Sequence, residues 1–165
     1  ILNIFEGAAE IQAQVIARRV TRVNPDTAFF AGIIHEIGGF YLIARGGAYP
    51  GLLDSPHGSL LPWDEGGAAA VGRAVLKHLG APAAVVEAIE GMWAGYLAMP
   101  PQSLADTLLL ADHLAPIESP LSQLAGNGRE GTAVDIDVAL DDQTLSSILD
   151  ESKLEVESLI DALRA

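Results

Sequence analysis

The stretch AFFAGIIHEIGGFYLIA, residues 28–44, is apolar at nearly every position apart from the adjacent His35 and Glu36. A helix that is hydrophobic on all sides is buried in the centre of a domain or in a membrane. An adjacent His and Glu in the middle of a bilayer would be costly, and a span needs about 20 apolar residues. We therefore predict that this stretch is the central helix of a helical domain, with His35 and Glu36 facing an interior pocket.

Length and composition favour a single cytoplasmic domain over residues 1–165. Half of the residues are hydrophobic and 19% are charged, which excludes a disordered chain. The absence of cysteine excludes disulfides and thiolate metal sites. No signal peptide is visible, and the chain opens at Ile1 rather than at Met, so we expect a fragment of a longer protein.

The charge balance argues against direct binding of nucleic acid. The net charge is −13, and only nine residues are Lys or Arg. The one basic cluster is Arg18, Arg19 and Arg22, at the end of the first predicted helix, where the helix dipole favours cations. Ten of the 22 acidic residues follow Arg129. We interpret them as a solvated helical face, with a docking surface for a basic partner as the alternative.

Apolar residues at spacings of three and four predict a first helix over Ile4–Arg22, which ends before Asn24-Pro25. Asn24 is the expected N-cap of the central helix, and Pro25 is its first residue. The pair Gly38-Gly39 is the expected point of a bend or a break.

Three more helices are predicted between residues 64 and 115. The first begins at Asp64 or Glu65 and ends at Leu79, with Gly80 as its C-cap. The second covers residues 83–98, and its apolar stripe, which includes Met92, Trp93 and Tyr96, should face the core. The third covers residues 103–115.

The remaining segments are predicted loops and a C-terminal helical region. Residues 45–64 and 116–132 are rich in Gly, Pro and Ser, as long loops are. His57, in the first loop, is expected to be exposed to solvent. Residues 141–164 carry apolar residues at helical spacing. Every periodic segment is therefore helical, and the predicted fold class is all-α.

Three stretches together resemble the HDOD domain, a branch of the HD superfamily that serves as an output domain in bacterial signalling proteins. AFFAGIIHEIGGFYLI is similar to the family stretch AFLAGLLHDIGKLVL, VGRAVLKHLGAPAAVVEAI (71–89) is similar to VGAxLLxxWxLPxxIxxAI, and LLLADHLA (108–115) is similar to VxLADxLA. They occur in the family order and cover roughly residues 5–115. The resemblance implies an HD-domain-like bundle of five to seven helices.

Active HD enzymes hold one or two metal ions with an ordered set of His and Asp ligands, and most of these are replaced here. The resemblance places the first ligand position on Phe5, the third-helix histidine on Ala68, and the later histidine pair on Met92 and Trp93. The HD pair itself falls on His35 and Glu36, and the final aspartate falls on Asp112.

The surviving positions are therefore His35, Glu36 and Asp112, which face apolar replacements. We expect a degenerate HD site with no catalytic residue, no metal and no cofactor, in which the three survivors form a buried hydrogen-bonded network. Two alternatives stay open. One is a metal-dependent phosphohydrolase acting on a nucleotide or cyclic dinucleotide. The other is a sensor that binds a ligand in the vestigial pocket.

The function implied by the resemblance is non-enzymatic signal transduction through protein–protein contacts, downstream of a response-regulator receiver or another sensory domain. The expected partners are proteins of a signalling pathway, and a homodimer is one candidate assembly. No membrane span and no direct nucleic-acid contact are expected.

Overall fold

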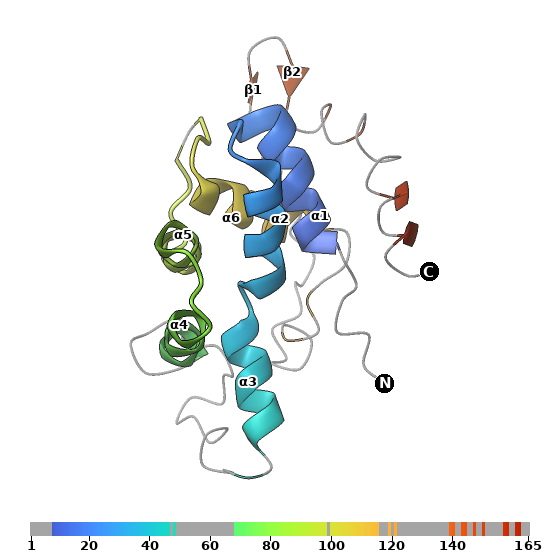
Figure 1. The fold of residues 1–165 in the computed structure, drawn as a ribbon. Helices are drawn as coiled ribbons and strands as arrows, with labels where there is room; N and C mark the ends of the chain where they lie inside the picture. The colour runs from blue at the N-terminus through green and yellow to red at the C-terminus, as the bar shows by residue number, and fades with distance from the viewer. Residues whose placement is uncertain are drawn as a thin grey trace.

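The fold is all-α, as predicted. The computed structural model describes residues 8–46, 48, 68–98, 100–115, 119, 121, 139–140, 143–144, 147, 150, 157–158 and 161–162. Within these residues the helices are α1 (Ala8–Ile16), the π-helical turn η1 (Ala17–Thr21), α2 (Pro25–Ile34), α3 (Ile37–Gly46), α4 (Ala68–His78), α5 (Ala83–Trp93) and α6 (Leu104–Leu114). Helix α1 packs against α2 and α6, α3 packs against α4, and α5 packs against α6 (Figure 1).

The first helix ends, and α2 begins, where the sequence predicts, whereas the predicted start of the first helix at Ile4 lies outside the described residues. The first helix passes through η1 and ends at Arg22, which has a left-handed φ of 56°. Asn24 caps α2, because its side-chain oxygen accepts the backbone N–H of Thr27 at 2.9 Å, and Pro25 is the first helical residue.

The break in the central helix lies at His35-Glu36 and not at Gly38-Gly39 as predicted. Nδ1 of His35 lies 2.5 Å from the carbonyl oxygen of Gly32. That oxygen is the acceptor that the Glu36 N–H would use in an uninterrupted α-helix. The His35 side chain therefore competes for this acceptor, and the chain makes a turn before α3 begins at Ile37.

The prediction that residues 28–44 are buried on all sides is wrong. Ala28, Ala31 and Gly32 are buried, whereas Phe30 and Tyr41 remain 44% and 42% exposed. The small residues face α1, where a Cβ at Gly32 would lie 2.7 Å from the Cα of Glu10. The two backbones approach closely on that side, Phe29 packs against Ile11 and Val15 of α1, and Phe30 lies on an exposed side of α2.

Helices α2 and α3 together are long enough and apolar enough to resemble a membrane span. In the described part of the chain, only residues Pro25–Arg45 are long and apolar enough to cross a membrane. Of an 18-residue apolar segment within them, 33% is buried inside the protein. The core helix of a soluble protein also meets these two criteria.

Helices α4, α5 and α6 build the rest of the core. Gly80, with a φ of 71°, ends α4, and the Ala81 N–H donates to the carbonyl of Leu76 as in a Schellman motif. Helix α5 ends at Trp93, five residues earlier than predicted, and Gly95 turns the chain with a φ of 73°. Tyr96 is therefore 86% exposed, and its predicted place in the core stripe is wrong.

Most of the predicted loops and the C-terminal region lie outside the described residues. This holds for His57, for the start of the helix predicted from Asp64 or Glu65, and for most of residues 116–132 and 141–164. Strands β1 (Ala139–Leu140) and β2 (Gln143–Thr144) pair antiparallel, with Ala139 opposite Thr144. The prediction of a helical segment over residues 141–164 is wrong at Gln143 and Thr144, because these two residues form strand β2.

Candidate functional site

His35 lies at the junction of α2 and α3 and is 7% exposed. Its position follows from the close contact of α1 and α2 at Gly32, three residues earlier. The ring nitrogen Nδ1 pairs with the Gly32 carbonyl, so part of the polar capacity of His35 is satisfied within its own helix. No buried side-chain nitrogen or oxygen in the described part of the chain lacks a partner.

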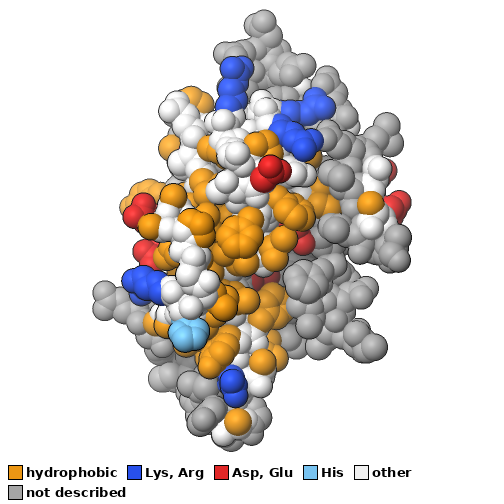
Figure 2. All heavy atoms as spheres, in the orientation of Figure 1, with side chains coloured by type: hydrophobic (Ala, Val, Ile, Leu, Met, Phe, Trp, Pro, Cys, Tyr) orange, Lys and Arg blue, Asp and Glu red, His pale blue; other side chains and the backbone are white. Residues whose placement is uncertain are grey.

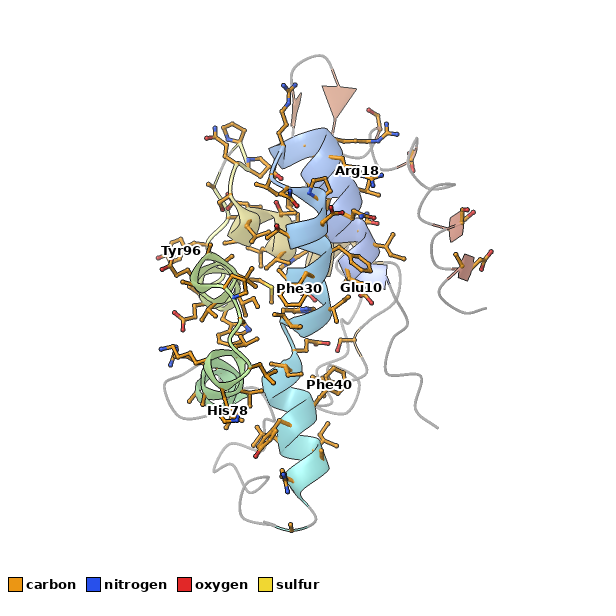
Figure 3. All side chains as sticks on the ribbon, viewed as in Figure 1. Glu10, Arg18, Phe30, Phe40, His78 and Tyr96 are labelled. Atoms are coloured by element: carbon orange, nitrogen blue, oxygen red, sulfur yellow. The ribbon has the colours of Figure 1, made fainter. Side chains whose placement is uncertain are left out.

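Glu10 on α1 is the site residue that the sequence reasoning missed. Burial raises the pKa of Glu10, and the charge of Glu36 raises it further, while a backbone hydrogen bond and the charge of His35 act in the opposite direction. Glu10, His35 and Glu36 are therefore close enough to interact electrostatically. Glu10 lies on α1 (Figure 3), and His35 and Glu36 lie at the junction of α2 and α3. Gly32 inside the apolar stretch was the available signal, because a glycine there marks close approach of another helix.

Asp112 lies on α6 and is half-buried. Glu36, in the turn just before α3, is half-buried as well. Asp112 makes a polar or charged interaction of its own. Within the described residues, no group of three or more His, Asp and Glu side chains is arranged to hold a metal ion. The structure therefore brings His35 and Glu36 near Glu10 but does not assemble His35, Glu36 and Asp112 into a set of metal ligands.

Apolar side chains occupy the described positions that the resemblance assigns to lost ligands. Met92 is 6% exposed and belongs to the main core cluster. Trp93 is half-buried, and its indole lies 3.0 Å from where a Cβ of Gly72 on α4 would be. Ala68 is the first residue of α4, and Phe5 lies outside the described residues. The donor set thus lacks the imidazoles that an HD metal centre requires, and the residues present do not fit such a centre.

Another carboxylate, Asp106 at the start of α6, is buried and has a structural role. Burial would raise the pKa of Asp106, but hydrogen bonds from the Ser103 hydroxyl and from the backbone N–H groups of Ala98, Ser103 and Gln102 together lower it. Ser103 and Asp106 also form the capping box of α6. This carboxylate fixes the loop before α6 and is not a candidate for catalysis.

The basic cluster predicted at Arg18, Arg19 and Arg22 lies at the end of the first helix, and all three residues are exposed. Arg18 and Arg19 each make an interaction with another group.

Comparisons with protein-family models, with curated proteins and with solved structures find no match to this chain.

Proposed function

We propose that this chain is a non-enzymatic signalling module that acts through protein–protein contacts and resembles the HDOD output domain. The three stretches that carry the resemblance coincide with helices: the first forms α2 and α3, the second spans α4 and most of α5, and the third covers the end of α6. The three stretches thus fall on helices and follow one another in the order of the family, which supports the proposal. The expected setting is a cytoplasmic pathway in bacteria, downstream of a receiver or another sensory domain.

The observation that carries the proposal is the replacement of the histidine pair by Met92 and Trp93. In an active site of this family, two imidazoles at these positions would help to hold the metal that activates the attacking water. Here Met92 packs with core residues such as Ile89, and the Trp93 ring lies against Gly72. An ion bound by the remaining carboxylates and His35 would need water for its other ligands, and a thioether and an indole give such water little support.

The phosphohydrolase alternative predicts a bound metal ion at the surviving positions. It requires a divalent ion that binds to His35 and Asp112 together, and the described residues show no such grouping. The loss of several ligands therefore favours a contact function over hydrolysis.

Calorimetric titration with Mn²⁺, Mg²⁺, Fe²⁺ and Zn²⁺ in turn, together with assays on linear and cyclic dinucleotides, tests the proposal. We expect only weak binding that is the same in wild type, His35→Ala and Asp112→Ala, and no turnover. Micromolar binding or turnover that disappears in both variants would overturn the proposal. Glu87→Gln on the exposed side of α5 is the matched control, because it changes a polar group away from the site.

A further inference from the structure

Helices α2 and α3, on either side of the break at His35-Glu36, each carry a row of side chains at helical spacing, and the two rows follow one another along the chain. Their members recur at spacings of three and four and are Asp26, Phe30, Ile33, Ile37, Tyr41 and Arg45. Residues with these spacings lie on one side of a helix. We call this set the α2–α3 stripe.

The apolar middle of the stripe is exposed. Phe30, Ile33 and Tyr41 are 44%, 36% and 42% exposed, whereas Ile37 is half-buried because it also packs against the main core cluster of its own chain. Figure 2 shows hydrophobic side chains gathered along the middle of this face. Contiguous exposed apolar surface of this kind marks an interaction site in soluble proteins.

The two ends of the stripe carry opposite charges. Asp26 is exposed in the first turn of α2, and Arg45 is exposed in the last turn of α3, with its guanidinium 5.6 Å from the centre of the Tyr41 ring. The order along the stripe is therefore acid, aromatic, aliphatic, aliphatic, aromatic, base. This order is self-complementary when the stripe meets a second copy running in the opposite direction.

We propose that the α2–α3 stripe is the interface of a two-fold symmetric homodimer, in which the α2–α3 segments of two copies lie antiparallel. Asp26 of one copy then faces Arg45 of the other, Phe30 faces Tyr41, and Ile33 faces Ile37. Each contact occurs twice, as a two-fold interface requires. The facing aromatic pairs flank an aliphatic centre, and an ion pair closes each end.

Charge complementarity favours a second copy over the surface of a membrane. Arg18, Arg19 and Arg22 lie near the Asp26 end, and an anionic lipid surface would attract them and Arg45 alike. Such a surface would give Asp26 no partner, whereas Arg45 of an antiparallel copy does. The inference does not depend on the proposed function, because an enzyme could form the same dimer.

Charge reversal tests the pairing of the two ends. Asp26→Lys and Arg45→Asp should each weaken dimerisation at least about tenfold, because each places like charges opposite each other twice. The double variant restores opposite charges and should dimerise within about threefold of wild type. Sedimentation equilibrium measures the dissociation constants, and Glu87→Lys on α5 is the control with a comparable charge change and no expected effect.

Disulfide cross-linking between two different cysteine variants tests whether the two copies lie antiparallel. It also tests the interface if a charge variant fails to fold. The chain has no cysteine, so Phe30→Cys and Tyr41→Cys chains of different tag length can be oxidised together. A dimer of unlike chains places the two thiols opposite each other and keeps the other Phe30–Tyr41 pair. Like chains would hold their thiols about 16 Å apart, at 1.5 Å per residue, beyond the reach of a disulfide.

The expected result is a dimer in solution whose disulfide forms between unlike chains. The inference is overturned by a monomer at every concentration, by equal cross-linking of like chains, or by a double charge variant that stays as weak as the single ones. A monomer that sediments with phosphatidylglycerol vesicles would also overturn it, and would assign the stripe to a lipid surface instead.

Discussion

His35 illustrates how one side chain can both interrupt a helix and depend on it. Its ring pairs with the Gly32 carbonyl in a buried position. We predict that His35→Ala lowers the free energy of unfolding by roughly 1–3 kcal/mol, because it removes a buried ring together with its hydrogen bond to the Gly32 carbonyl. Urea denaturation measures the change. His113→Ala is the matched control, because the His113 ring pairs with the Leu109 carbonyl at 2.9 Å but is exposed. Equal losses in the two variants would contradict the prediction.

Glu10 should make stability depend on pH. Burial raises the pKa of Glu10 in the folded protein above its ordinary value of 4.5. The folded state therefore holds this proton more tightly than the unfolded state, and stability falls as pH rises from near 4.5 through the folded pKa. We predict that Glu10→Gln is more stable relative to wild type at pH 7 than at pH 4. Urea denaturation at both values measures this, and an identical difference at the two would refute it.

At the scale of one element, the start of α6 depends on Asp106. The carboxylate accepts backbone N–H groups of Ala98 and Ser103, both at 2.9 Å, and of Gln102 at 3.1 Å. We predict that Asp106→Asn lowers the free energy of unfolding by about 1–3 kcal/mol at pH 7, because the amide turns a donor toward these donors.

The pH dependence of the Asp106 contribution has the opposite sign to that of Glu10. The pKa of Asp106 is lowered on folding, so its stabilisation is complete above its ordinary value of 3.8 and is lost as pH falls through the folded pKa. The gap between wild type and Asp106→Asn should therefore shrink in acid. Glu87→Gln, an exposed carboxylate on α5, should show no such gap, and an equal effect in both variants would rule out the role given to Asp106.

The contact of α1 with α2 depends on a missing side chain. A Cβ at Gly32 would lie 2.7 Å from the backbone Cα of Glu10, whereas at Gly39 it would meet only the flexible side chain of Leu121. We predict that Gly32→Ala lowers the free energy of unfolding by about 1–3 kcal/mol, since the two helices must move apart. Gly39→Ala should cost clearly less, because Leu121 can change its rotamer. The order of the two denaturation midpoints checks this, and the reverse order would contradict it.

Sequence periodicity located these elements well, and it failed where tertiary contacts decide. The N-cap at Asn24 is a local signal that the sequence states directly. The break at His35 depends on a side chain that takes a backbone acceptor, which periodicity does not register. The end of α5 before Tyr96 depends on Gly95, a residue that helices also tolerate in their interior.

For the whole molecule, composition and helical spacing were sufficient to predict the all-α fold. They were not sufficient to predict which side of the central helix is buried, because Phe30 and Ala31 are both apolar and only the packing of α1 distinguishes them. The candidate site was predicted only in part for the same reason. His35 and Glu36 stand out within an apolar run, whereas Glu10 lies beside them only because α1 packs closely against α2, which periodicity does not reveal.

The central claim of the proposed function is that this all-α chain works without a metal centre, and the most direct measurement is the metal content of protein purified without a chelator. Plasma mass spectrometry should find Mn, Fe and Zn far below one ion per chain, with no difference between wild type and His35→Ala. The reason is that the buried Met92 and the Trp93 ring beside Gly72 stand where the HDOD resemblance places two metal ligands. One equivalent of any of these metals in wild type, lost in His35→Ala while the variant remains folded, would contradict the claim.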